Sequence, residues 1–298
     1  MNIYNIGLIL ISAGFHALWN ILTRLSDNSP VFSGIKGTWL LIFSLVFFFI
    51  EGLPPQELWF WGIISGVLHA LYIFCLSRAY SMLEISYVYP IARSAPAFVP
   101  GVAFLLLDER IAWQSFFGIT LILTGIYYLH FEARLIQGFS KVWDAIVHKD
   151  LRWAFLTLVM VVSYSIWDKY SMKIYFTLLP NNGFSNGISF FLMEAGICFF
   201  LYNLYLAMGF SRREILDRIR MEWAWGFIGA VATLGSYGLI CVVLQYEAVS
   251  KVVALRQTSV LMVVYWGGWQ LGEPFGKQRS FSAILILVGA ILIGWKAT

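Results

Sequence analysis

The stretch LLLDERIAWQSFFGITLILTGI, Leu105 to Ile126, has a counterpart near the end of the chain in GWQLGEPFGKQRSFSAILILVGAI, Gly268 to Ile291. At a shift of 164 positions, which places Gly125 on Gly289, at least seven residues are identical in the two stretches. In the first stretch these residues are Leu107, Glu109, Phe117, Leu121, Ile122, Leu123 and Gly125. Internal similarity at a fixed offset indicates duplication. We therefore interpret the chain as two copies of one structural unit.

Composition indicates the environment of these units. Of the 298 residues, 60% are hydrophobic and only 12% are charged, whereas soluble domains are about 25% charged. A helix that crosses a bilayer needs about 20 mostly apolar residues, and ten segments meet this requirement. They are roughly 3–23, 32–50, 58–79, 86–107, 112–131, 152–175, 184–208, 223–245, 250–271 and 280–297. The sequence thus predicts an all-α integral membrane protein with ten transmembrane helices.

The ten predicted helices divide into two sets of five. We assign residues 1–132 to the first repeat, 133–151 to a polar connector and 152–298 to the second repeat. Because each copy has an odd number of spans, the two copies must enter the membrane from opposite sides. Inverted repeats are typical of secondary transporters, whose substrate site lies near the midplane between the halves. A duplicated scaffold without transport is the alternative.

Several other classes of protein are disfavoured. The net charge of +4 is not gathered into a basic patch, so we expect no nucleic-acid partner. The three cysteines are isolated in apolar segments and have no metal-ligand spacing. We find no HExxH, no paired carboxylates at reactive spacing and no nucleophile motif. We therefore expect no enzymatic activity, no catalytic residues, no metal and no cofactor.

Ionisable residues inside predicted spans are the first candidates for function, because each costs several kcal/mol unless it faces protein or water. They are His16, His69, Arg93, Asp168, Lys169, Glu194 and Arg256. Three other charged residues, Lys36, Arg78 and Glu247, lie close enough to predicted helix ends for their side chains to snorkel to the interface.

Arg93 carries a permanent charge in an apolar region and needs an anionic partner. Asp168 and Glu194 are two candidates inside the protein. The third is a carboxylate or phosphonate of a substrate, which a guanidinium group can bind in a bidentate manner. A structural ion pair and direct substrate binding both remain open.

Prolines surround Arg93 in the predicted fourth span. Pro90 removes a backbone hydrogen bond and leaves a carbonyl that only protein or a cavity can satisfy. We expect this opening of the helix to face a cavity that Tyr89 borders. Pro96 and Pro100 are four residues apart, and we expect them to bend the helix.

Two carboxylates are candidates for proton coupling. Glu194 lies alone in the seventh span, where a buried carboxylate is stable only if it is paired or protonated. A proton carrier and a static partner of Arg93 or Arg256 are the two interpretations. Asp168 is adjacent to Lys169, and neighbouring helix positions point in different directions. We expect Asp168, rather than Lys169, to face the cavity.

Three residues of the first span form a further group. His16 and Asn20 are four apart and share a helix face, while Trp19 occupies the place in the first repeat that Trp167 occupies in the second. Trp19 could line the cavity or stack on a substrate amine. For His16, a hydrogen-bonded packing role is the alternative to binding.

The runs GLILISAGFHALWN, AYSMLEISYVYPIARSAP with LLLDERI, and LRQTSVLMVVYWGGWQLGEPF resemble the drug/metabolite transporter superfamily, specifically its ten-helix EamA-type members. The resemblance covers essentially the whole chain. The positions that match one branch of this family are His16, Trp19, Asn20, Tyr89, Pro90, Arg93, Tyr164, Asp168, Arg256, Thr258 and Ser259. The chain departs from the branch at Gln257, where a glutamate is usual, and at Ser94, where a glycine is usual. The resemblance implies transport of small metabolites such as amino acids or amines.

The resemblance and the ionisable residues inside predicted spans together predict a secondary active transporter that works by alternating access and is coupled to protons. Its cargo would be a small polar metabolite with an anionic group, such as an amino acid. We expect Arg93, Trp19, Asn20, Tyr89, His16 and Arg256 to bind substrate, Glu194 and Asp168 to couple protons, and Pro90 to open the helix. The alternatives are a flippase of an amphipathic or lipid-linked substrate and a non-transporting receptor or scaffold. A monomer and a homodimer both remain open, in the inner or plasma membrane of a cell.

The orientation of the chain is set by its basic residues. Thirteen Lys and Arg residues lie in connectors after odd-numbered spans, against four on the other side. The positive-inside rule then places both termini outside the cytoplasm. The family resemblance implies the opposite orientation.

Overall fold

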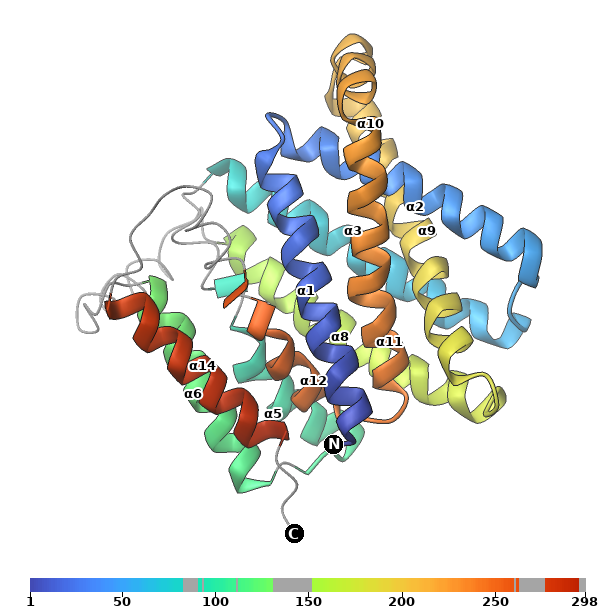
Figure 1. The fold of residues 1–298 in the computed structure, drawn as a ribbon. Coiled ribbons are helices and arrows are strands. Elements are labelled where there is room, and N and C mark those ends of the chain that lie inside the picture. Colours follow the sequence, from blue (N-terminus) through green and yellow to red (C-terminus); the bar gives the residue numbers. More distant parts are fainter. Residues whose placement is uncertain are drawn as a thin grey trace. The chain divides into compact units, whose positions relative to one another are not determined.

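The computed structural model describes residues 1–82, 91–92, 94–110, 112–130, 152–259, 261–262 and 277–294. Within these ranges all regular secondary structure is helical (Figure 1), which confirms the predicted all-α class. The chain forms two compact units. Unit 1 consists of residues 1–6, 74–166 and 247–298, and unit 2 consists of residues 7–73 and 167–246. Each unit takes residues from both predicted repeats.

Unit 2 contains most of the long apolar helices and three short helical elements. They are most of α1 (Ile3–Leu25), α2 (Ser29–Glu51), the short 3₁₀ helix η1 (Gln56–Leu58), the first part of α3 (Trp59–Met82), the last part of α8 (Arg152–Leu178), α9 (Gly183–Gly209), α10 (Arg212–Thr233), the π-helical turn η3 (Leu234–Gly238) and α11 (Leu239–Leu244). Unit 1 contains α5 (Ala95–Leu107), α6 (Trp113–His130), α12 (Val249–Arg256) and α14 (Lys277–Gly294). The remaining ends of α3 and α8 also belong to unit 1.

Five stretches of the described residues are long and apolar enough to cross a membrane. They are Ile3–Thr23, Ser29–Glu51, Gln56–Ala79, Gly183–Gly209 and Arg212–Leu244. Helix α2 shows the expected lipid-facing side, because its large side chains Leu45, Phe49 and Ile50 are 71%, 91% and 71% exposed. Apolar side chains that protein does not cover are stable in hydrocarbon. The chain is therefore an integral, multi-pass membrane protein.

Local sequence accounts for the start and the packing of α2. Asn28 caps the helix by accepting a hydrogen bond from the Val31 amide at 3.1 Å, and Pro30 lies in the first turn, where a missing amide proton costs little. Gly37 faces Phe199 of α9 so closely that a β-carbon would clash with the ring. Small residues allow transmembrane helices to approach one another, and this contact holds α2 against α9.

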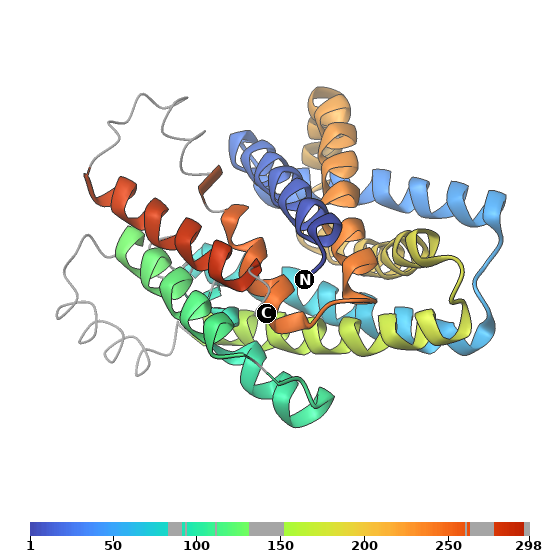
Figure 2. The same ribbon diagram turned by 60° about the horizontal axis from the view of Figure 1, so that its bottom comes forward.

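Helices α6 and α14 of unit 1 lie side by side in Figures 1 and 2. A β-carbon at Gly118 would lie 2.6 Å from the Gly289 carbonyl oxygen, and one at Gly289 would lie 2.5 Å from the Gly118 carbonyl oxygen. A β-carbon at Gly125 would lie 2.9 Å from the carbonyl oxygen of Ser282. The shift of 164 positions takes Gly118 to Ser282 and Gly125 to Gly289. The two contacts are therefore exchanged by the repeat, as inverted copies would require.

Glu109, one of the residues shared by the two repeats, caps another helix of unit 1. Its carboxylate accepts hydrogen bonds from the Val249 amide at 2.9 Å and from the Ser250 hydroxyl at 3.0 Å. These residues open α12, where the helix dipole and unpaired amides favour a negative charge. The family turn LLLDERI thus has a structural role here.

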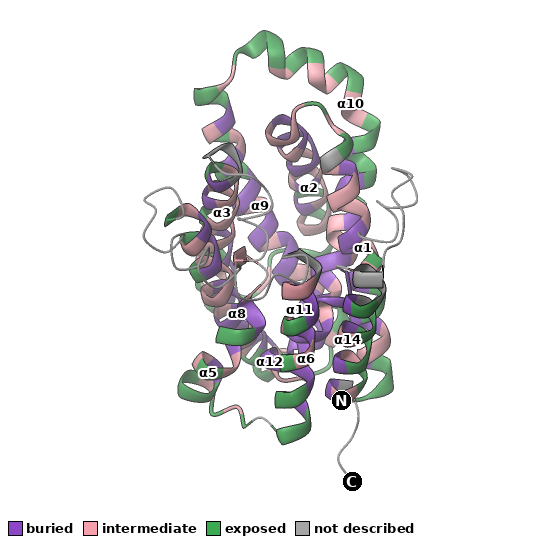
Figure 3. Ribbon diagram, turned by 90° about the vertical axis from the view of Figure 1, so that its left-hand side faces the viewer, coloured by how far each residue is buried: buried purple, intermediate pink, exposed green. Residues whose placement is uncertain are grey.

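Three details differ from the sequence-based expectations. Helix α10 begins at Arg212, before the predicted span at 223, because Ser211 caps it by accepting from the Glu214 amide at 3.2 Å. Figure 3 shows these first turns as exposed. Pro96 lies in the first turn of α5, where it starts the helix rather than bends it, and only Pro100 is inside the helix. Lys36, which we expected to snorkel, is buried with 4% exposure.

Candidate functional site

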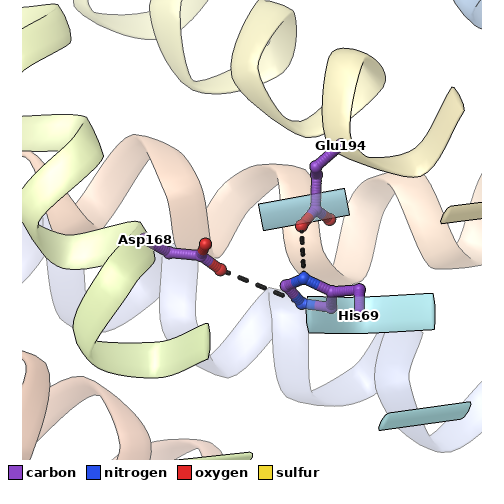
Figure 4. A group of neighbouring side chains, drawn as sticks. All are labelled: His69, Asp168 and Glu194. Atoms are coloured by element: carbon purple, nitrogen blue, oxygen red, sulfur yellow. Dashed lines mark ion pairs between the residues drawn. The ribbon is translucent and has the colours of Figure 1, made fainter. Parts of the chain in front are cut away.

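Five polar residues meet inside unit 2, and we call them the polar cluster. Ser65 and His69 come from α3, Asp168 from α8, Glu194 from α9 and Tyr237 from η3. Asp168 is 0% exposed and Glu194 is 2% exposed. Figure 4 shows the imidazole of His69 between the two carboxyl groups. Two carboxyl groups buried this deeply in a membrane protein mark a functional site.

The approach of α3 to α9 depends on glycine. A β-carbon on Gly66 would lie 2.8 Å from the backbone oxygen of Glu194 and 2.7 Å from Cβ of Ile197. Gly62, one turn earlier, faces Met193 in the same way. This spacing of two glycines four residues apart is a familiar contact between transmembrane helices. It brings Ser65 and His69 within reach of Glu194.

Asp168 is held by two hydroxyl groups. Ser65 Oγ donates to Asp168 Oδ1 at 2.5 Å, and the Tyr237 hydroxyl donates to Oδ2 at 2.5 Å. His69 Nε2 lies 3.8 Å from Oδ2. Short hydrogen bonds from hydroxyl groups stabilise a charged acceptor. Asp168 is thus the carboxyl group of the cluster that accepts from two hydroxyl groups.

Glu194 has a different set of partners. Its Oε2 lies 2.6 Å from His69 Nδ1 and 2.9 Å from Ser65 Oγ. His69 Nδ1 also lies 3.0 Å from the Ser65 carbonyl oxygen. Since a carbonyl can only accept, Nδ1 carries a hydrogen and donates it. Within the described residues, the charged partner of Glu194 is therefore a histidine rather than an arginine.

The π-helical turn explains how Tyr237 enters the cluster. Its sequence, LGSYG, contains two glycines, and Gly235 packs against the Phe15 ring. A π turn leaves the regular ladder of hydrogen bonds, and the Ser12 hydroxyl of α1 donates to the Ser236 carbonyl at 2.6 Å. Serine side chains satisfy backbone groups in this manner inside membranes. Turns of this kind often occur at functional sites.

The cluster has more hydrogen-bond contacts than its hydroxyl and imidazole hydrogens can fill one by one. Ser65 Oγ carries one hydrogen but lies near both carboxyl groups, and its shorter contact is with Asp168. The two carboxyl groups therefore share the single hydrogen of the Ser65 hydroxyl group. The two carboxyl groups are therefore linked through one hydroxyl group and one imidazole.

The same groups could also hold a cation. One ligand atom each from His69, Asp168 and Glu194 lie within 4.8 Å of one another. Nitrogen and carboxylate donors suit ions such as Zn²⁺ or Mn²⁺. The described geometry, however, already uses these atoms in contacts with each other and with Ser65 and Tyr237. The sequence analysis predicted no metal site.

Three of the predicted substrate-binding residues lie on α1 in unit 2. The rings of His16 and Trp19 meet edge to face, with centroids 5.0 Å apart. His16 is buried, and its Nδ1 lies 3.4 Å from Ser236 Oγ. Asn20 donates from Nδ2 to the His16 carbonyl at 2.6 Å, so its amide nitrogen is used within its own helix. Trp19 also faces another helix, because Lys36 Nζ of α2 lies 4.0 Å from the centroid of its ring.

The other predicted site residues fall elsewhere. Arg256 ends α12 and belongs to unit 1. Arg93, Tyr89 and Pro90 lie outside the described residues. Their roles therefore stay predictions from the sequence.

Both carboxylates could be predicted from the sequence, but their partners were not predicted. His69 was expected only as an ionisable residue without a role, and Ser65 and Tyr237 were not predicted at all. A signal for these partners is present in the sequence. Ser65 and His69 are four residues apart on an apolar helix, and so are the neighbouring Gly62 and Gly66. The divergence of Asp168 and Lys169 was predicted correctly, since Lys169 Nζ donates away from the cluster to the Leu244 carbonyl at 2.7 Å.

Helices of membrane-spanning length around a buried ionisable cluster define a polytopic membrane protein. Residues 4–131 match the EamA-like transporter family, and the resemblance seen in the sequence is thereby confirmed for the first predicted repeat. EamA-like proteins are membrane transporters of small molecules rather than enzymes. The match shows that residues 4–131 are similar to this family.

Comparison of structures extends the fold to nearly the whole chain. A solved structure described only as "Crystal structure of protein" is 14% identical, with a TM-score of 0.67. The similarity covers 97% of this chain and 95% of the other. At this identity it shows the fold alone. No curated protein matches the sequence.

Proposed function

We propose that the protein is a proton-coupled secondary transporter of a small polar metabolite that carries an anionic group, such as an amino acid, in the inner or plasma membrane of a cell. The observation that carries this proposal is the hydrogen-bond count of the polar cluster. Ser65 Oγ lies between two buried carboxyl groups and has one hydrogen for both, so a proton held by one of the carboxyl groups would complete the hydrogen bonds. A buried carboxyl group that can hold and release a proton is the element that coupling requires.

The charges of the cluster favour one exchangeable proton. An imidazolium at His69 and a carboxylate at Asp168 offset each other, and a protonated Glu194 keeps the whole group neutral. Loss of the Glu194 proton leaves a net negative charge in a region of low dielectric constant, which is costly without water or a cation. An arriving ammonium group or a hydrated opening would supply that compensation. Proton release would thus be linked to substrate binding or to a change in access.

Flux through purified protein in proteoliposomes tests this proposal. Amino acids and their decarboxylated amines are offered under a pH gradient imposed in either direction. We expect accumulation of an amino acid or a close analogue that a protonophore abolishes. Binding without flux would indicate a receptor, and movement of a labelled lipid alone would indicate a flippase. Either outcome would contradict proton-coupled metabolite transport.

Arg93 offers a second test, drawn from the sequence. We expect Arg93→Lys to reduce the transport rate roughly ten- to hundredfold, because a hydrogen bond to a charged group contributes about 1.5–3 kcal/mol and lysine lacks the planar bidentate geometry. Expression and melting temperature should stay near wild type. Transport is measured as initial uptake, and stability by thermal unfolding in detergent. Equal losses of transport and stability would instead indicate a structural ion pair.

A further inference from the structure

Lys36 is a second buried cation, and it lies in unit 2. It occupies the second turn of α2, a helix whose residues Ser29–Glu51 are long and apolar enough to cross the bilayer. Its side chain is only 4% exposed, so the ammonium group does not snorkel to the membrane interface as we expected from the sequence. A lysine enclosed in this way needs a favourable partner for its charge.

The surroundings of Lys36 are aromatic. Its Nζ lies 4.0 Å from the ring centroid of Trp19 on α1 and 5.9 Å from that of Phe199 on α9. A β-carbon on Gly229 of α10 would lie 3.4 Å from Cγ and Cδ of the lysine. Three helices therefore enclose the Lys36 side chain, and an aromatic face stabilises its charge.

No anion among the described residues completes this arrangement. Lys36 Nζ makes no hydrogen bond or ion pair with any residue that the structure describes. The two buried carboxyl groups of unit 2, Asp168 and Glu194, already contact His69 and neighbouring hydroxyl groups. A cation–π contact leaves the ammonium hydrogens available, because it uses the ring face and not an acceptor atom.

From this we infer that Lys36, with Trp19, forms a binding subsite for an oxyanion, namely the carboxylate or phosphonate group of the substrate. This inference rests on the proposed transport function, and it names a second residue, besides Arg93, for the anionic end of the cargo. The ammonium group is a compact charge that can meet an oxygen atom in several orientations. The indole of Trp19 positions it and excludes water from one side.

Thermal unfolding of the purified full-length protein tests the subsite directly. Acetate, inorganic phosphate and methylphosphonate serve as probes, with chloride at matched ionic strength as the reference. We expect at least one oxyanion to raise the melting temperature of the wild type saturably, by about 2–4 °C or more. Lys36→Met should lose this shift, and Lys36→Arg should keep most of it. A shift that persists in Lys36→Met, or no shift in the wild type, would overturn the inference.

A matched control and a second measurement cover the case in which Lys36→Met does not fold. Lys169→Met removes the same charge from a lysine that donates to the Leu244 carbonyl, and it should keep the oxyanion-dependent shift. In the wild type, methylphosphonate should slow reductive methylation of Lys36, as followed by mass spectrometry of its peptide. An unchanged rate of methylation would also count against the subsite.

Flux measurements separate the failure of this inference from the failure of the proposed function. If the wild type shows the oxyanion shift but no proton-driven flux, the proposed function fails and the subsite stands. If Lys36→Met transports an amino acid as fast as the wild type, the subsite fails and the transport function stands.

Discussion

Replacing Glu194 by glutamine is expected to abolish accumulation driven by a pH gradient while leaving the protein folded. Glutamine has the shape of a protonated glutamic acid. Glu194 Oε2 makes both contacts of the wild type, and the glutamine oxygen can take its place and accept there from His69 Nδ1 and from Ser65 Oγ. Glutamine cannot release a proton. In proteoliposomes, substrate should therefore reach equal concentrations inside and outside, with or without the gradient, at a melting temperature close to that of the wild type.

Two comparison variants sharpen this prediction. Glu222→Gln changes a carboxylate of α10 that accepts from Ser26 at 2.9 Å and lies away from the cluster's hydrogen bonds, and it should accumulate substrate normally. Asp168→Asn replaces an acceptor of two hydroxyl hydrogens by a group with one oxygen and one donor amide. It should lower the melting temperature, because a donor then faces a donor. Normal accumulation by Glu194→Gln, or loss of accumulation in Glu222→Gln, would show that Glu194 is not the coupling residue.

The second large effect is expected at Gly66, where α3 touches α9. In Gly66→Leu the new side chain would meet the Glu194 backbone and Ile197, which cannot move aside without separating the helices. We expect a loss of about 1–3 kcal/mol in the free energy of unfolding. Transport should also be lost, because Ser65 and His69 would no longer reach Glu194. Thermal unfolding and initial uptake rates measure the two effects.

Gly101→Leu provides the matched control for this substitution. It makes the same replacement in α5, where nothing lies within 4 Å of the added β-carbon. A leucine there should face lipid and change stability by no more than about 0.5 kcal/mol. If Gly66→Leu were as stable and as active as Gly101→Leu, the close contact of α3 and α9 would not be needed for the cluster.

Much of the fold could be predicted because the length and apolarity of a transmembrane helix can be seen within one segment of the sequence. Length and apolarity alone locate α1, α2, α3 and α9 to within a few residues. The start of α10 could not be located in this way. The first turns of α10 are polar and depend on the cap at Ser211 and on contacts such as the one between Arg218 and Asp27 at 2.8 Å. A hydropathy profile detects neither the cap nor the ion pair.

The candidate site was predicted less completely, because it is made by contacts between distant segments. The cost of burying charge was enough to select Asp168 and Glu194. It could not reveal that His69 pairs with both, since this depends on the register of α3 against α8 and α9. Lys36 was misassigned for a related reason. Distance from a helix end suggested a route to water, but Trp19 and Phe199 of other helices enclose the side chain.

The contact between α6 and α14 has a consequence for how this sequence can change in evolution. Gly118 and Gly289 each fit against the backbone of the other helix, and Gly125 meets Ser282 in the exchanged position. Such a surface is self-complementary, as in a symmetric dimer. Neither copy can accept a larger residue there unless the other changes with it. We therefore expect substitutions at these contact positions of α6 and α14 to be coupled, even where the rest of the two predicted repeats has diverged.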